Sequence, residues 1–237
     1  MTKKEAITKL FNEALDIHKK NQLKQAEIIY NKILLLDLSH SDTLNNLGLI
    51  YFSRDNPEKA ETFFKKSIYY NSNNKTAYQN LANLYQKSKK YKEAAENYFK
   101  LIDLDPKNIQ AYNSLGIIYH NFQNFQKAKN CFKKIIEFDD KNFSAYYNLG
   151  KILNDEEKYE EAIKNFKKTL QINQMHSNAL NELGIAYSKL SLSEKAIECL
   201  NKSIKINPKN SHSYNNLGIV YDNTYNTKKA KENFNKA

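Results

Sequence analysis

The apolar positions of the chain follow the spacing of paired amphipathic helices. In residues 41–74, Leu44, Leu47 and Tyr51 are separated by three and four residues, which places them on one face of a helix. Ala60 and Phe64 then begin a second series at four-residue intervals. The pattern therefore predicts two helices in this segment.

The residues between and after these helices are typical of helix ends. Asp55-Asn56-Pro57 separates the two apolar series, and proline suits the first turn of the helix that follows it. An asparagine side chain can accept a hydrogen bond from the first turn of a helix. Asparagines in this role are expected at the ends of four units: Asn74, Asn108, Asn142 and Asn210. Each unit is therefore predicted to be an antiparallel helical hairpin.

The same pattern repeats every 34 residues without an insertion. All five glycines are separated by multiples of 34: Gly48, Gly116, Gly150, Gly184 and Gly218. Ala14 and Ala82 occupy the two remaining positions of that row. Twelve residues after each member stands an alanine: Ala26, Ala60, Ala94, Ala128, Ala162, Ala196 and Ala230. The period divides the chain into a lead-in of residues 1–6 and the units 7–40, 41–74, 75–108, 109–142, 143–176, 177–210 and an incomplete 211–237.

The small residues predict how the hairpins are built and stacked. Glycine or alanine on the first helix and alanine on the second remove bulk where the helices cross, so the axes can approach to about 8–10 Å. A hairpin of 34 residues cannot bury both of its faces alone, so neighbouring hairpins are expected to stack. The predicted fold is all-α: an α-α superhelix of about seven hairpins, forming a single solenoid domain over residues 7–237.

Over residues 7–237 the pattern resembles the tetratricopeptide repeat, through residues such as Leu47, Gly48, Tyr51, Ala60 and Phe64. The resemblance implies a right-handed superhelix whose first helices line a concave groove that binds peptides or partner proteins. One feature departs from the family, which favours glycine in the turn within each hairpin. Here that position holds Asn21, Asp55, Lys89, Gln123, Glu157, Ser191 and Tyr225.

Carboxamide side chains recur at two adjacent positions of the first helices, before the Leu-Gly or Leu-Ala pair. A carboxamide both donates and accepts hydrogen bonds, so a row of them could satisfy the backbone of an extended peptide. Ser114 and Glu182 interrupt one of the two rows. The predicted groove residues are Asn12, Asn45, Asn46, Leu49, Phe52, Gln79, Asn80, Asn113, Ile117, His120, Tyr147, Asn148, Asn181, Ile185, Asn215 and Asn216. The alternative interpretation is that these asparagines serve packing between the hairpins.

These features favour a non-catalytic scaffold that binds an extended peptide or a partner helix in its groove. The alternative is the substrate-recruiting part of a larger glycosyltransferase, because the O-linked N-acetylglucosamine transferases resemble this chain in carrying an inner asparagine ladder. The carboxylate clamp of the family, which holds acidic chaperone tails, is disfavoured because its basic positions hold Asn45, Gln79, Asn113, Tyr147 and Asn181.

The net charge of +11 raises the question of nucleic acid or membrane binding. One lysine recurs on the outer side of every second helix: Lys32, Lys66, Lys100, Lys134, Lys168, Lys202 and Lys236. A solvated outer face explains these lysines, so nucleic acid and membrane partners are disfavoured. The start of the chain predicts an amphipathic helix rather than an apolar signal segment, which favours a cytoplasmic protein.

The sequence gives no support for an active site. Every glycine is committed to a helix crossing, which leaves none for a phosphate-binding loop. The histidines have no second ligand at i+3 or i+4, so they are expected to be polar groove or capping residues, and no metal, cofactor or small-molecule substrate is predicted. Cys131 and Cys199 are too far apart along the stack to pair and are expected to be small core residues.

The two ends of the repeat array differ in polarity. Glu13 and Asp16 replace the apolar residues of the other units, as expected for a solvated terminal face. Leu217, Val220 and Phe234 keep the interior pattern, which predicts either a piece of a longer chain or self-association through this end.

Overall fold

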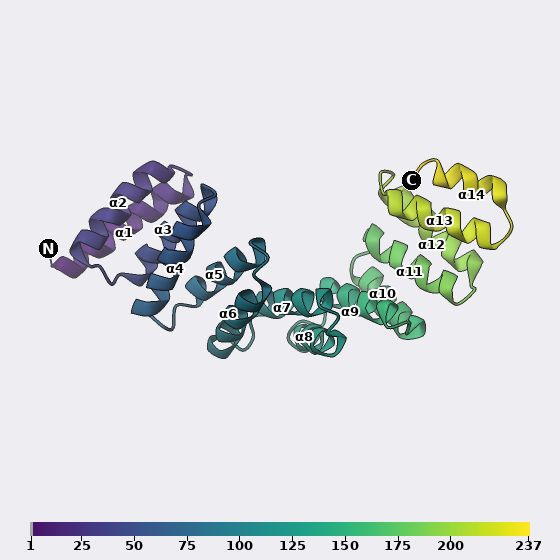
Figure 1. Cartoon of the computed structure of the whole chain (residues 1–237), viewed down its shortest axis with the longest axis horizontal. Coiled ribbons are helices and arrows are strands. Elements are labelled where there is room, and N and C mark those ends of the chain that lie inside the picture. Colours follow the sequence, from purple (N-terminus) through teal and green to yellow (C-terminus); the bar gives the residue numbers. More distant parts are fainter. Residues whose placement is uncertain (1) are drawn as a thin grey trace. The chain divides into compact units, whose positions relative to one another are not determined.

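A computed structural model describes residues 2–237, and within them the chain forms fourteen α-helices and no strand. The helices are α1 (Lys3–Lys19), α2 (Leu23–Leu36), α3 (Ser41–Ser53), α4 (Pro57–Tyr70), α5 (Lys75–Lys87), α6 (Tyr91–Leu104), α7 (Ile109–Asn121), α8 (Phe125–Phe138), α9 (Phe143–Asp155), α10 (Tyr159–Ile172), α11 (Ser177–Lys189), α12 (Ser193–Ile206), α13 (Ser211–Asn223) and α14 (Thr227–Phe234). Figure 1 shows the short connections that join each odd-numbered helix to the next one. The predicted all-α solenoid of helical hairpins is confirmed.

The helices belong to two compact units, one ending at Ala111 and the other beginning at Tyr112. In the first unit, α1, α3 and α5 are the first helices of three hairpins and α2, α4 and α6 are their second helices. The second unit contains α8 and the hairpins that pair α9 with α10, α11 with α12 and α13 with α14, while α7 crosses the boundary between Ala111 and Tyr112. The prediction of one domain over residues 7–237 stays a prediction.

The first helix is longer than its counterparts at its amino end. It begins at Lys3, within the predicted lead-in of residues 1–6, whereas the later first helices begin at the residue equivalent to Ile7. A capping box causes this early start, because the Thr2 hydroxyl accepts a hydrogen bond from the Glu5 amide at 3.2 Å and the Thr2 amide donates to the Glu5 carboxylate at 2.8 Å. The lead-in is therefore helical from Lys3 onward.

Each glycine lies where the two helices of a hairpin cross, against a bulky residue of the second helix. A Cβ atom added to Gly150 would stand 2.6 Å from the nearest ring atom of Phe166, far inside contact distance. The corresponding distance from Gly48 to Phe64 is 2.5 Å, and Gly184 is approached at 2.7 Å by Leu200. Glycine is therefore required by the packing of the hairpins.

Where the row holds alanine, the bulky residue is tyrosine instead of phenylalanine. Ala14 is matched by Tyr30 and Ala82 by Tyr98, and all four residues are fully buried. The Tyr98 hydroxyl donates at 2.7 Å to the Gln86 side chain on α5, and the Tyr30 hydroxyl lies 3.3 Å from the Nδ1 atom of His18 on α1. The hydroxyl group thus finds a partner one turn further along the first helix.

The turn within every hairpin contains a residue in the left-handed conformation. The φ angles lie between 56° and 60° for Asn21, Asp55, Lys89, Gln123, Glu157, Ser191 and Tyr225. These are the seven positions at which the sequence lacks the glycine that the family favours. Each turn therefore carries backbone strain that a glycine would not have.

Most of the predicted asparagine caps are formed. Asn74, Asn108 and Asn142 each accept a hydrogen bond from the backbone amide three residues later, at 2.9–3.1 Å. The prediction for Asn210 is wrong, because its side chain makes no capping bond to α13. Two of the 34-residue repeats end in histidine instead of asparagine, and the Nδ1 atoms of His40 and His176 cap α3 and α11.

The exposure of the end residues agrees only in part with the polarity of the sequence. Glu13 and Asp16 are exposed on α1, as predicted. Leu217 and Val220 are 3% and 2% exposed, and the Phe234 side chain that packs over Gly218 is 41% exposed. A polar substitution of Val220 would therefore disturb the hairpin core, so Phe234 is the residue with which to test self-association.

No helix of residues 2–237 combines the length and the apolar character needed to span a lipid bilayer.

Candidate functional site

The amides of the first helices in the first unit bind one another. Asn45 on α3 is 4% exposed, and its Oδ1 atom accepts a hydrogen bond of 2.9 Å from the Asn80 side chain on α5. Asn46 bonds to the Tyr30 hydroxyl, and Gln79 donates to Asn83 at 3.0 Å on the same helix. Two of the predicted groove residues, Asn45 and Asn80, thus join consecutive hairpins.

The remaining predicted residues of the first unit are more accessible. Asn12 is exposed and Leu49 is half-buried. Phe52 is half-buried beneath the Lys87 ammonium group, which lies 4.9 Å from the ring centroid and 3.3 Å from the Asp55 carboxylate. These residues do not form a cluster of free polar groups.

The second unit repeats the amide pair and adds a hydroxyl group. Asn181 on α11 is 6% exposed, and its Oδ1 atom accepts hydrogen bonds from the Asn216 side chain at 2.9 Å and from the Ser213 hydroxyl at 3.2 Å. The pairs Asn45–Asn80 and Asn181–Asn216 are both separated by 35 residues. The same contact between consecutive hairpins therefore occurs once in each unit.

A polar hollow of about 420 Å³ lies beside this pair on the first helices of the second unit. We call it the Glu182 hollow. It is lined by Tyr147, Asn178, Asn181, Glu182, Ile185, Asn210, His212 and Asn216. Four of these residues were predicted from the sequence, namely Tyr147, Asn181, Ile185 and Asn216. The exposed Asn178 was missed because it lies in the first turn of its helix, outside the two amide rows, whereas the exposed His212 was expected only in general terms, as a polar groove or capping histidine.

Glu182 is the acidic residue of the hollow, and it interrupts the asparagine row. Burial raises the pKa of its carboxyl group, while the charge of Lys151 and hydrogen bonds from Asn154 and Asn181 oppose the rise. The Asn154 amide donates to the carboxylate at 3.4 Å and to the Glu182 backbone carbonyl at 3.3 Å. The Oδ1 atom of Asn154 is buried without a hydrogen-bond partner. Glu182 is thus a desolvated acceptor with weak donors.

An aromatic group lies beside Glu182 in the hollow. Tyr147 is half-buried, its ring centroid is 4.8 Å from that of His176, and burial raises its pKa to about 12, with the Glu182 charge as a second cause. The neutral phenol can therefore donate a hydrogen bond at any physiological pH.

The other predicted residues of the second unit are distributed along its first helices. Asn113, Ile117 and Asn148 are half-buried and Asn215 is exposed. His120 on α7 is paired with Asp155 on α9, with 2.6 Å between the Nε2 and Oδ2 atoms. None of these residues lines the Glu182 hollow.

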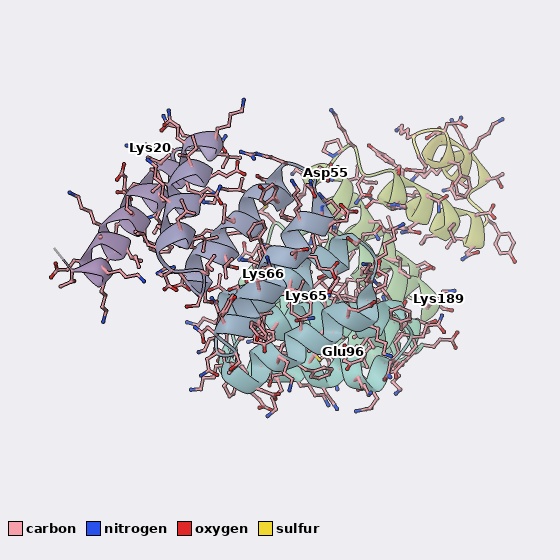
Figure 2. All side chains as sticks on the ribbon, turned by 60° about the vertical axis from the view of Figure 1, so that its left-hand side comes forward. Lys20, Asp55, Lys65, Lys66, Glu96 and Lys189 are labelled. Carbon is pink, nitrogen blue, oxygen red and sulfur yellow. The ribbon has the colours of Figure 1, made fainter. Side chains whose placement is uncertain are left out.

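The recurring lysines lie on the second helices, on the outer side of the hairpins. All of them are exposed except Lys168, which is half-exposed. Figure 2 labels Lys65 and Lys66 on α4, where Lys65 pairs with Glu61 at 2.7 Å. Lys134 and Lys202 form similar pairs with Glu137 and Glu198, both at 2.6 Å. None of the recurring lysines lines the Glu182 hollow, which agrees with a solvated outer face.

The cysteines and acidic residues offer no reactive or metal-binding group in the described part of the chain. Burial raises the pKa of both the Cys131 and the Cys199 thiol to about 11, so the nucleophilic thiolate is scarce at neutral pH. Within residues 2–237, no three His, Cys, Asp or Glu side chains come together in a group that could hold a metal ion.

Family models agree with the repeat seen in the structure. Four models described as tetratricopeptide repeats match residues 41–74, 87–121, 109–142, 142–209 and 199–232. The chain belongs to the tetratricopeptide repeat family. No curated protein matches its sequence.

Solved tetratricopeptide repeat structures resemble this protein over most of its length. A repeat protein from Parabacteroides merdae covers 98% of this chain and 92% of its own at 20% identity, with a TM-score of 0.73. The C-terminal part of a repeat protein from Cytophaga hutchinsonii covers 95% of this chain and 93% of its own at 17% identity, with a TM-score of 0.79. YrrB, described as having an unusual peptide-binding site, covers 78% of this chain and 95% of its own at 23% identity, with a TM-score of 0.68.

These similarities establish the fold of this tetratricopeptide repeat protein. Proteins of the family bind protein or peptide partners, which fits the prediction of an interaction scaffold. The resemblance to the O-linked N-acetylglucosamine transferases stays a hypothesis.

Proposed function

We propose that this tetratricopeptide repeat protein is a non-catalytic interaction scaffold that binds an extended peptide across the first helices of its second unit. The observation that carries the proposal is the Glu182 hollow, where donors and acceptors from α9, α11 and α13 converge on about 420 Å³ of open space. This volume lies within the range of ligand-binding pockets in proteins.

The chemistry of the hollow suits a peptide backbone. Asn178 and His212 are exposed at its rim, and no capping bond engages the Asn210 side chain. Carboxamides can bond to both the N–H and the C=O groups of an extended chain, each bond contributing about 0.5–1.5 kcal/mol. Ile185 adds an apolar surface for a side chain of the peptide. YrrB, of similar fold, has a peptide-binding site, which supports the same class of ligand here.

The test must separate binding from folding. Asn80 and Asn216 are unsuitable for this purpose, because their amides bond to buried asparagines and their loss would change stability as well. We expect the double variant Asn178→Ala/His212→Ala to weaken binding of a peptide selected on this protein at least fivefold, with an unchanged melting temperature.

Fluorescence anisotropy with the labelled peptide measures the affinity, and circular dichroism measures the melting temperature. Asn201→Ala removes an exposed asparagine from the outer helix α12 and serves as the matched control. Equal affinity of the double variant and the control would contradict a peptide site in the hollow.

A further inference from the structure

Glu182 places a carboxylate at a position where the equivalent residues of the chain are neutral. Five of the 34-residue repeats have asparagine at this position, namely Asn12, Asn46, Asn80, Asn148 and Asn216, and one repeat has Ser114. Two residues of this row, Asn80 and Asn216, donate a hydrogen bond to an asparagine of the preceding hairpin. A carboxylate has no proton to donate in this way, so Glu182 cannot form this bond and instead adds a charge.

The surroundings do not neutralise that charge. Among the residues that the structure describes, no lysine, arginine or histidine nitrogen comes within 4.0 Å of the Glu182 carboxylate. Lys151 on α9 acts on it from a longer distance, and Asp155 on the same helix opposes Lys151. The other titratable lining groups are Tyr147 on α9 and His212 on α13.

Asn154 and Asn181 both contact the Glu182 carboxylate, and their own oxygen atoms add further acceptors beside it. The Asn154 amide that donates to the carboxylate leaves its own Oδ1 atom buried and unpaired. The Oδ1 atom of Asn181 already accepts two hydrogen bonds, from Asn216 and Ser213. An unpaired carboxylate in a desolvated position costs free energy, which an added cation can offset. Ammonium and guanidinium groups have only donors, so they complement such a site.

We propose that the Glu182 hollow accepts the side chain of a lysine or arginine from the bound peptide. This inference rests on the proposed peptide-binding function and specifies its ligand: an extended segment with a basic residue at the position that faces α11. The amides of Asn178 and Asn210 are then available to the peptide backbone, while Glu182 selects the side chain. The carboxylate clamps of the family select acidic partners, whereas this site selects a partner of the opposite charge.

The experiment starts from twelve-residue peptides selected from a random phage-displayed library on the full chain. Each selected peptide is synthesised twice, once as selected and once with lysine replaced by norleucine or arginine by citrulline, which keeps the shape and removes the charge. We expect the neutral analogue to bind the wild-type protein at least tenfold more weakly in fluorescence anisotropy. Glu182→Asn, which restores the asparagine of the other units, should bind both peptides equally and at the weaker level.

Two further variants keep the result interpretable. Glu182→Gln preserves the size of the side chain and should behave as Glu182→Asn does, even if one of the two folds poorly. Glu194→Gln removes an exposed carboxylate from the first turn of α12 and should retain the tenfold preference of the wild-type protein.

The outcomes separate this inference from the function on which it rests. If selected peptides bind but their charged and neutral forms have equal affinity for the wild-type protein, the inference is wrong and the peptide site stands. If the preference persists in Glu182→Asn and Glu182→Gln, another acidic group selects the cation and the inference is also wrong. If no peptide binds, both proposals fall. A final experiment uses spermidine, a free polyamine, as a competitor of the labelled peptide. If spermidine bound as tightly as the peptide does, the result would contradict recognition of a peptide side chain.

Discussion

At the scale of single residues, the row of glycines shows how strongly the hairpin crossing restricts side-chain size. Alanine favours a helix over glycine by about 1 kcal/mol, so an exposed Gly→Ala change would stabilise the chain. Gly150 is different, because a Cβ atom there would overlap the Phe166 ring. The sign of the stability change therefore reports whether the contact exists.

We expect Gly150→Ala to lower the free energy of unfolding by about 1–3 kcal/mol through overpacking. Urea denaturation measures the change. Gly184→Ala should lower stability as well, because a Cβ atom there would stand 2.7 Å from the Leu200 side chain. A Gly150→Ala protein as stable as the wild type would contradict the crossing geometry.

The strained turns give a prediction of opposite sign. Lys89 has a φ angle of 58°. Glycine adopts this conformation without steric cost but loses more entropy on folding, so Lys89→Gly should stabilise the chain by about 0.5–1 kcal/mol. Asn21→Gly is the matched comparison in the first compact unit. It should raise stability by less than Lys89→Gly does, because asparagine tolerates the left-handed region. Thermal unfolding of the two variants ranks them, and a larger gain for Asn21→Gly would refute this account of strain.

Some side-chain pairs were missed because they depend on how the helices of a hairpin face each other. Lysines in the first turn of second helices lie over tyrosines of the first helix eight residues earlier: Lys59 over Tyr51, Lys127 over Tyr119, Lys195 over Tyr187 and Lys229 over Tyr221. The nitrogens are 5.1–5.7 Å from the ring centroids, a distance at which cations attract aromatic faces. In one repeat Leu153 stands at the tyrosine position and Glu161 at the lysine position, whereas in another Tyr85 is kept and Glu93 stands at the lysine position. The two positions therefore do not change together in every repeat, and the sequence carries no clear signal of the contact.

At the scale of elements, the N-terminus of α11 depends on the protonation of one histidine. The Nδ1 atom of His176 accepts a hydrogen bond of 3.1 Å from the Ala179 amide, and only the unprotonated nitrogen can do so. Burial lowers the pKa of His176 below its usual value of about 6.5. The unfolded chain therefore binds a proton at a higher pH than the folded chain does.

Because this pKa is lower in the folded state, the contribution of His176 is complete above about pH 6.5 and is lost as the pH falls through the folded value. His18, whose pKa burial also lowers, acts in the same direction. We expect the melting temperature to fall between pH 7 and pH 5, and to fall less in His176→Asn, which keeps a capping side chain that does not titrate. Asn201→Ala changes an exposed side chain that does not titrate and should retain the wild-type pH dependence. Identical pH profiles for the wild type and His176→Asn would exclude this role.

The two amide pairs between consecutive hairpins differ in the number of donors: Asn45 accepts a side-chain hydrogen bond from Asn80, whereas Asn181 accepts from both Asn216 and Ser213. Asn80→Ala removes the donor to Asn45 and leaves a buried Oδ1 atom unpaired, which costs about 1–3 kcal/mol. Asn216→Ala should cost less, because the Ser213 hydroxyl still donates to Asn181. Urea denaturation of the two variants should rank them in this order. The reverse order would show that the amide bonds do not carry the contact.

The sequence predicted the elements much better than it predicted the candidate site. The helix pairs, crossings and three of the four asparagine caps depend on residues close in the chain, so a 34-residue period contains them. The Asn45–Asn80 bond spans 35 residues and depends on the docking of one hairpin on the next. The Glu182 hollow depends on three first helices at once. The polar positions in the sequence therefore indicated the first helices as the binding face, but they did not show which residues come together in the Glu182 hollow.

At the scale of the whole molecule, the net charge of +11 includes recurring lysines on every second helix, and some lysines of these helices, such as Lys65, Lys134 and Lys202, pair with a glutamate on the same helix. Nucleic acid binding needs lysines or arginines that neutralise several phosphates together, which gives a steep inverse dependence of affinity on salt. We expect binding to duplex DNA to be weaker than 10 µM at physiological ionic strength, on the order of non-specific contacts. An electrophoretic mobility shift assay between 50 and 200 mM salt tests this, and submicromolar affinity at the higher salt would contradict it.

The two thiols, of which Cys131 is buried and Cys199 half-buried, have a practical consequence for experiments on the intact molecule. With a pKa near 11 instead of about 9, Cys131 and Cys199 hold about a hundredfold less thiolate at pH 7 than an ordinary cysteine. A maleimide dye should therefore react with a cysteine introduced on the surface and leave the two natural ones largely unmodified. Donor and acceptor fluorophores could then be attached to the two units, one on each side of Ala111, without first removing any native residue.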